Sequence, residues 1–162
     1  MLGISISPGA GAVASMSSGR AHGWRRGIWT AVGQQLALVL FLLISALGLA
    51  SLLRSSPKTV QALTVFGALY LAWIGLRMWH AALRPRKNAA PEQGVVPASR
   101  LGMIRYGFLA NASNPKALLA LFVITPNFID PAHSLPAQYT IIGVTMVAID
   151  LAVMAVYTAI GS

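Results

Sequence analysis

Residues 28–53 read IWTAVGQQLALVLFLLISALGLASLL, an apolar stretch of 26 residues without a charged side chain. A helix of about 20 apolar residues crosses a hydrocarbon core roughly 30 Å thick, so this stretch is long enough to span a membrane. The whole chain has the same character, because 56% of its 162 residues are hydrophobic and only 9% are charged. An ordinary soluble domain has about 25% charged residues. The stretch therefore predicts a transmembrane helix and not the core helix of a soluble protein.

Four further apolar segments accompany this span. We expect a partial span at about 2–19 and full spans at 59–79, 107–129 and 139–162. Helices satisfy all their own backbone groups, which is the requirement that lipid places on a spanning segment. The sequence thus predicts an all-α, polytopic transmembrane helix bundle that forms a single domain over residues 1–162. The first span is short and the last has no basic flank, so we interpret the chain as apparently truncated at both ends.

The basic residues mark the topology of this bundle. The formal net charge is +9 and the pI is near 11.3, values that nucleic-acid-binding proteins also show. However, the polar gaps at 20–26, 54–58, 77–105 and 130–138 contain three, two, six and no basic residues. This alternation is the pattern of the positive-inside rule. We therefore place the first gap and a linker at about 80–106 in the cytoplasm, and we expect no nucleic-acid partner.

Several kinds of chemistry are excluded or disfavoured by composition. The chain has no cysteine, which excludes disulfides and thiolate metal sites. Its three histidines fall in or beside predicted loops with few carboxylates nearby, so we expect no metal site and no cofactor. No nucleophile inside a span lies beside a recognisable base and orienting group, so we do not expect an enzyme.

Two charged side chains, Lys116 and Asp150, lie inside predicted spans. A charge at the centre of a membrane helix costs about 2.5–3.5 kcal/mol on insertion scales, so each needs an internal partner or a watery cavity. At roughly 1.5 Å per residue in a core about 30 Å thick, Lys116 lies about 13 Å and Asp150 about 14 Å from the inner face. Lys116 and Asp150 therefore have two interpretations: they form a structural ion pair that locks two helices, or they bind substrate or carry protons.

Two prolines interrupt the apolar segments. Pro115 removes a backbone donor and clashes with the preceding turn, which predicts a helix break at 112–114. Pro8 and Gly9 interrupt the first apolar segment in a similar way. Freed backbone groups at membrane depth are tolerated only where protein or a watery cavity satisfies them, so both breaks indicate a binding site.

Each break is followed by a polar residue within the next span, Gln35 after Pro8 and Asp150 after Pro115. The first broken span runs inward and the second outward in the predicted topology. This arrangement predicts an inverted repeat, in which secondary transporters build a central site from broken helices. Gln34 and Gln35 form an amide pair with two readings: a hydrogen bond across a helix interface, or the lining of a substrate path.

Four motifs together resemble the lysine exporter and homoserine/threonine resistance (LysE/RhtB) superfamily of amino-acid efflux proteins. They are SISPGAG at 5–11, HGWRRGIWTAVGQQ at 22–35, NASNPKALL at 111–119 and VAIDLAVM at 147–154. The resemblance implies a six-helix protein of the bacterial inner membrane that exports amino acids or their relatives, coupled to the proton gradient. Gln35 stands where lysine-exporting relatives tend to carry an acidic residue, which implies a neutral substrate.

The expected function is therefore proton-coupled efflux of amino acids or derivatives, of the homoserine/threonine type, by a multi-pass transporter. The predicted substrate and ion site comprises Pro8, Gly9, Gln35, Asn114, Pro115, Lys116 and Asp150. In it Lys116 would hold a substrate carboxylate, and Asp150 would carry the coupling proton or neutralise Lys116. The expected partners are a small-molecule amino acid and the lipid bilayer, with a homo-oligomer left open. The alternative is a membrane scaffold or degenerate transporter fragment that does not transport.

Overall fold

The computed structural model describes residues 9–52, 95–119, 128–130 and 132–162, with isolated positions between 58 and 80. Every regular element among these residues is a helix, which confirms the all-α prediction for the described part. The chain divides into two compact units, residues 1–46 with 94–162 and residues 47–93. The first unit contains the described site residues and is the one considered below. The predicted span at 59–79 and the first part of the linker lie outside the described residues, apart from the isolated positions.

A single glycine joins the first two described helices, α2 (Ala10–His22) and α3 (Trp24–Leu52). Gly23 has a φ of 73°, a left-handed conformation that glycine adopts without a steric penalty. Its backbone N–H donates to the carbonyl of Gly19 at 2.7 Å, which closes the last turn of α2. The chain therefore reverses direction within one residue, although the charges had predicted a polar gap at 20–26.

The third and fourth helices, α5 (Arg100–Ala112) and α6 (Pro115–Leu119), are separated by a break. The hydroxyl of Ser99 caps α5 by accepting from the backbone N–H of Gly102 at 3.0 Å. Two residues, Ser113 and Asn114, separate the end of α5 from Pro115 at the start of α6, which confirms the predicted break at 112–114. Helix α5 begins before the predicted span, which started at residue 107, because a helix can continue beyond the part of it that lies in lipid.

The last helix, α7 (Leu135–Gly161), begins at a short polar cap. Gln138 receives a hydrogen bond from the backbone N–H of Asp130 at 2.8 Å and donates one to its carbonyl at 2.8 Å. The Asp130 carboxylate also pairs with His133 at 2.8 Å, and both side chains are exposed. These contacts hold the segment before α7 against its first turn.

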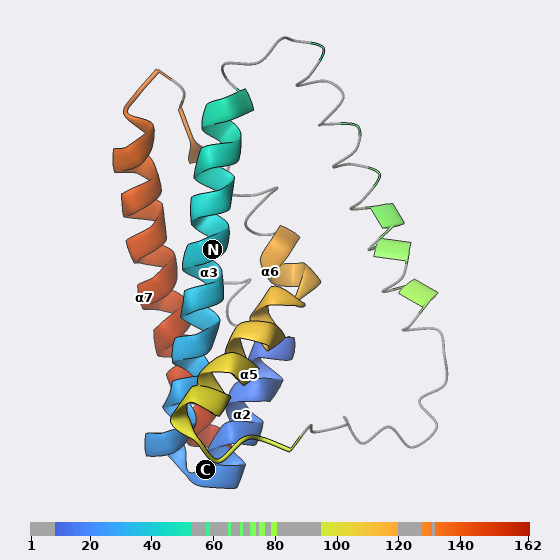
Figure 1. Cartoon of the computed structure of the whole chain (residues 1–162), viewed down its shortest axis with the longest axis vertical. Helices are drawn as coiled ribbons and strands as arrows, with labels where there is room; N and C mark the ends of the chain where they lie inside the picture. The colour runs from blue at the N-terminus through green and yellow to red at the C-terminus, as the bar shows by residue number, and fades with distance from the viewer. Residues whose placement is uncertain are drawn as a thin grey trace. The chain divides into compact units, whose positions relative to one another are not determined.

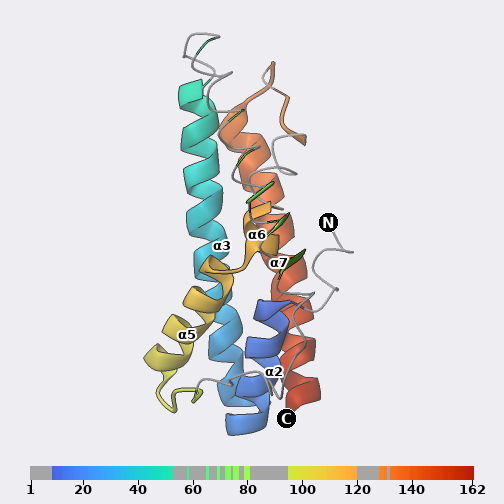
Figure 2. The same cartoon turned by 90° about the vertical axis from the view of Figure 1, so that its right-hand side faces the viewer.

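Hydrogen bonds set the directions of the helices around α3 (Figures 1 and 2). Contacts of Ser18 with Thr30, and of Ser15 with Gln34, make α2 antiparallel to α3. The pairs formed by Gln35 with Asp150, and by Ser45 with Tyr139, make α7 antiparallel to α3 as well. Figure 1 shows α3 and α7 side by side along most of their length, with α5 rising in the same direction as α3.

Glycines bring these helices into backbone contact. A Cβ added at Gly33 would meet the carbonyl oxygen of Ile104, and one added at Gly107 would meet that of Thr30, so α3 and α5 cross through two glycines. In the same way, Gly19 of α2 faces the backbone of Thr158, and Gly161 of α7 faces that of Met16. Small residues at helix crossings are the usual means of close packing in membranes, where lipid provides no hydrophobic force between helices.

Two of the described helices are long and apolar enough to cross a membrane, Trp24–Gly48 and Leu135–Gly161. Large apolar side chains on α7 are exposed, among them Ile141 at 67% and Val144 at 66%. Extended exposed apolar surface of this kind marks contact with a membrane or another protein. The outer face of α7 is therefore suited to lipid.

Candidate functional site

Buried polar side chains lie between the apolar helices, centred on Gln34 of α3. This residue is 1% exposed, and its amide nitrogen donates to the carbonyl of Gly11 at 3.1 Å and to the hydroxyl of Ser15 at 3.0 Å. A glutamine amide has two N–H donors, so both are used on α2. One turn away, the hydroxyls of Ser18 and Thr30 contact each other at 2.7 Å. Gln34 therefore holds the first turns of α2 against α3.

The backbone carbonyl of Gln34 also binds the end of α5, next to the break between α5 and α6. The side-chain amide of Asn111, in the last turn of α5, donates to the carbonyl of Gln34 at 2.9 Å. Asn114 lies in the break itself, is 9% exposed, and accepts a hydrogen bond from the backbone N–H of Leu118 at 3.1 Å. The start of α2 and the end of α5 thus meet at one level of α3.

Gln35, the next residue, faces α7. Its amide nitrogen donates to a carboxylate oxygen of Asp150 at 2.8 Å. Gln35 is only 7% exposed, and its amide oxygen is buried without a hydrogen-bond partner among the described residues. Leaving a buried acceptor unsatisfied costs about 1–3 kcal/mol, and native structures contain few such atoms. The pair therefore holds an acceptor atom that this conformation does not use.

The structure describes most of the predicted site. Gly9 is the N-cap residue of α2, and Asn114 and Pro115 form the junction of α5 and α6. Gln35 and Asp150 are brought together, a pairing that the sequence analysis did not predict. Pro8 and the side chain of Lys116 lie outside the described residues, so the pairing of Lys116 with Asp150 stays a prediction.

Three further polar residues lie at this site: Ser15, Gln34 and Asn111. For Gln34 the sequence analysis had given a hydrogen bond across a helix interface as one interpretation, and its bonds to Gly11 and Ser15 of α2 confirm it. Asn111 was not predicted, although it begins the recognised motif NASNPKALL. Its place in that motif was the available signal. Ser15 had none, because a serine in an apolar helix is common and often bonds only to its own backbone.

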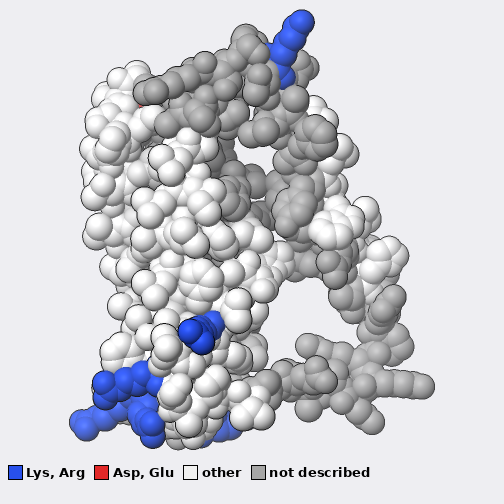
Figure 3. All heavy atoms as spheres, viewed as in Figure 1, with Lys and Arg blue, Asp and Glu red and all other residues white. Residues whose placement is uncertain are grey.

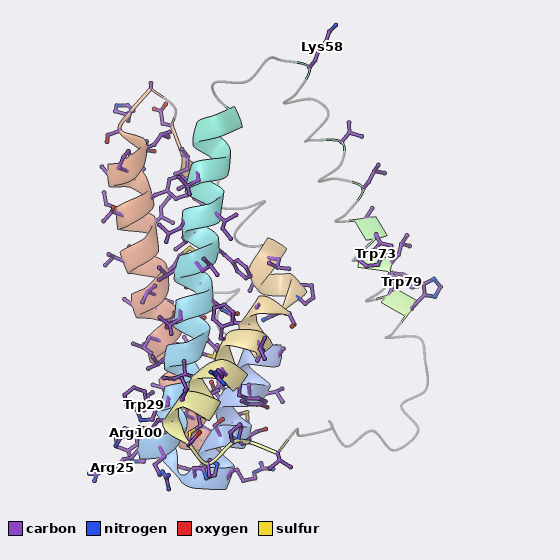
Figure 4. The ribbon with its side chains drawn as sticks, viewed as in Figure 1. Arg25, Trp29, Lys58, Trp73, Trp79 and Arg100 are labelled. Atoms are coloured by element: carbon purple, nitrogen blue, oxygen red, sulfur yellow. The ribbon has the colours of Figure 1, made fainter. Side chains whose placement is uncertain are left out.

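Basic and aromatic residues gather at one end of this unit, where α2 ends and α3 and α5 begin (Figures 3 and 4). The guanidinium of Arg100 lies 5.5 Å from the ring centre of Trp29, and that of Arg25 lies 6.0 Å from that of Trp24. Arg26 donates to the carbonyl of Ala98 at 3.0 Å. Arginine and tryptophan are typical of the water interface of a membrane, so this end fits the predicted cytoplasmic boundary.

Within the part of the chain that the structure describes, no group of three or more His, Cys, Asp or Glu side chains could hold a metal ion. Asp150 supplies a part-buried carboxylate next to Gln35, and amides and hydroxyls supply the buried polar atoms around it. Such a set can bind a small polar molecule through hydrogen bonds and one negative charge.

Comparisons with known proteins relate the chain to membrane translocators. The family model described as LysE type translocator matches residues 2–162. A membrane protein of Vibrio cholerae without an assigned function is 31% identical over 98% of this chain and 76% of its own length. The homoserine/homoserine lactone efflux protein of Salmonella typhimurium is 32% identical over 95% of this chain and 73% of its own. A leucine efflux protein of an Enterobacter species is 28% identical over 93% and 71%, respectively. No solved structure matches the chain.

Proposed function

The chain belongs to the LysE type translocator family, and from this premise we propose that it exports amino acids or their derivatives by proton-coupled efflux across the bacterial inner membrane. Its family makes it a membrane translocator and not an enzyme. The proposal adds a substrate of the homoserine/threonine type, coupling to protons and a multi-pass position in the inner membrane.

One observation carries this proposal: the carboxylate of Asp150 lies against Gln35 between two long apolar helices. A charged group within a membrane helix is expensive and is kept where it handles substrates or ions. A purely structural polar contact would use all its buried hydrogen-bonding atoms, whereas the Gln35 oxygen has no described partner. The pair of Gln35 and Asp150 therefore supports a binding site for a ligand that binds and is released.

The names of the relatives narrow the substrate. They name homoserine, homoserine lactone and leucine. All three carry an amino group on the carbon next to the carbonyl carbon, but the lactone has no free carboxylate. For this chain we therefore propose a small amine with a short neutral side chain, for which a carboxylate is an additional and not an essential group.

The helix breaks supply the remaining polar groups. In the proposal, Gly9 with Pro8 and Asn114 with Pro115 are the two half-helix ends of an inverted repeat, whose exposed peptide dipoles bind the polar end of the substrate. The hydrogen bonds from Gln34 to Gly11 and from Asn111 to Gln34 support this, because they hold both ends at one level of α3. Lys116 would bind the carboxylate of substrates that have one.

Asp150 is the proposed carrier of the coupling proton, or else the group that neutralises Lys116. To test its role, the whole chain and its Asp150→Asn variant are reconstituted in vesicles loaded with labelled homoserine, and efflux is followed with and without an imposed pH gradient. We expect the variant to lose the acceleration by the gradient. Asp130→Asn is the matched control, because Asp130 is 57% exposed in a loop and should leave coupling intact. Unchanged coupling in Asp150→Asn would remove this residue from the mechanism.

A membrane scaffold that does not transport is the competing proposal. The two hydrogen bonds that the Gln34 amide donates to α2 and the glycine crossings are features that such a scaffold would share. Growth in toxic concentrations of homoserine or threonine separates the two. We expect cells that express the chain, alone or extended at both ends with segments of the Salmonella typhimurium relative, to tolerate more of either compound. No gain from either form would favour the scaffold.

A further inference from the structure

Gln34 and Gln35 are chemically identical but differ in how completely their amides are used. Gln34 donates both amide hydrogens to α2. Gln35 donates to Asp150 at 2.8 Å and keeps an amide oxygen that is buried and has no described partner. The side chain is 93% buried, since its exposed fraction is 7%. The unused atom is therefore a hydrogen-bond acceptor inside the bundle.

The hydrogen bond to Asp150 fixes which atom is unused. While Asp150 is ionised its carboxylate oxygens only accept, so the amide turns its nitrogen toward Asp150. The reverse orientation would place two acceptor oxygens 2.8 Å apart. The amide oxygen of Gln35 and the carboxylate of Asp150 thus form a pair of acceptors with one negative charge, contributed by α3 and α7.

A primary ammonium group is the ligand that matches these two acceptors. It carries three N–H donors and one positive charge, so it can bind the carboxylate and the amide oxygen at the same time. A carboxylate or a carbonyl group could not, since neither has a donor. The buried amide oxygen also needs a donor to offset its lost hydration, which an ammonium group would provide.

We propose that the Gln35 amide oxygen and the Asp150 carboxylate form the binding site for the ammonium group of the substrate, and that Gln35 makes the protein selective for free amines over their acylated forms. This inference rests on the proposed function and assigns one end of the substrate to one pair of residues. The amine enters between α3 and α7, where the contact of Gln35 with Asp150 opens to admit it. Gln34 has no part in the selection and holds α2 and α5 in place.

Equilibrium binding tests the site without requiring transport. Binding of labelled homoserine lactone to the whole chain in detergent is measured in competition with homoserine and with N-acetylhomoserine lactone, which has no ammonium group. We expect homoserine to compete and the acetylated compound to compete at least tenfold less well. Because a hydrogen bond to a charged group is lost, Gln35→Met should weaken lactone binding about ten- to a hundredfold. It should also reduce the preference for the free amine.

Two further variants separate selection from folding. Gln35→Glu keeps an acceptor oxygen at the same distance along the side chain, and we expect it to retain the preference for the amine. Ser45→Ala removes a hydroxyl that contacts Tyr139 at 3.2 Å between the same two helices, away from Asp150, and should leave the preference unchanged. Size-exclusion chromatography of each variant checks that it is folded. If Gln35→Met failed to fold, loss of the amine preference in Gln35→Glu or in Ser45→Ala would overturn the proposal.

The outcomes distinguish this inference from the proposed function. Binding that depends on Gln35 in a chain that exports nothing would overturn the transport function and leave the ammonium site standing. Transport or binding with the same amine preference in wild type and Gln35→Met would overturn the ammonium site and leave the transport function standing. Equal binding of the free and acetylated lactones by the wild type would also overturn the site.

Discussion

Replacing Gly107 by alanine should force α3 and α5 apart where they cross. A Cβ built on this glycine lies 2.8 Å from the carbonyl carbon of Thr30 and 3.1 Å from its Cα. Both atoms belong to helical backbone, so neither can rotate away. Carbon atoms in favourable contact are about 3.5–4.0 Å apart, so the helices would have to separate by about 1 Å. The added methyl group therefore acts on the whole crossing.

The energetic cost follows from that displacement. Overpacking a close contact costs about 1–3 kcal/mol. A shift of about 1 Å would lengthen the hydrogen bond from Asn111 to the Gln34 carbonyl, now 2.9 Å, beyond hydrogen-bonding range. Its loss costs about 0.5–1.5 kcal/mol. Alanine gains about 1 kcal/mol over glycine in helix propensity. The net destabilisation is then about 0.5–3.5 kcal/mol.

Thermal unfolding in detergent, followed by circular dichroism, measures this effect. For a chain of this size each kcal/mol lowers Tm by about 2–4 °C. Gly143→Ala is the matched control, because a Cβ there would meet only Leu42, with its nearest atom 3.4 Å away. We expect the control to be neutral or slightly stabilised through helix propensity. Equal stability of Gly107→Ala and Gly143→Ala would refute the close crossing of α3 and α5.

Three other substitutions test the local structure. Gln34→Leu leaves the buried Ser15 hydroxyl without its donor and should destabilise the chain by about 1–3 kcal/mol in denaturant unfolding. Undiminished stability would show that this amide does not hold α2. Gly23→Ala places a Cβ at a φ of 73° and should lower the free energy of unfolding by about 1–2 kcal/mol in the same assay. An unchanged free energy of unfolding would contradict the tight turn. Ser99→Ala removes the cap of α5 and should speed amide exchange in its first turn, with a loss of about 1 kcal/mol. Unaltered exchange there would count against the cap.

The sequence predicted the helical class and the break at Pro115 because both follow from local chemistry. Apolar length sets the need for helices in lipid, and a proline cannot continue the turn before it. The residues at which the helices begin and end were harder to predict from the sequence. Charges indicate where lipid ends, whereas Gly23 and Ser99 determine where the helices end. The two boundaries differ at the turn between α2 and α3 and at the start of α5.

The pairing of Gln35 with Asp150 was beyond the sequence analysis for a different reason. Depth along a helix can be estimated from the rise per residue, and this placed Asp150 near the level of Lys116. The direction in which a side chain points depends on how its helix is rotated about its own axis. A helix that is apolar on all sides has no sequence periodicity from which this rotation could be predicted. In this chain the rotation of α3 is fixed by backbone contacts at Gly33 and by the bonds of Gln34.

Those contacts explain why two adjacent glutamines have different roles. Successive residues of a helix point about 100° apart, so a side chain that reaches α2 leaves its neighbour facing elsewhere. Once the amide of Gln34 is bonded to Gly11 and Ser15, Gln35 must face α7, where Asp150 lies. Loss of the Gln34 contacts would therefore free α3 to rotate and disturb the acceptor pair indirectly. A Gln34 variant should thus lose both stability and substrate binding, whereas Gln35→Met should lose binding with little loss of stability.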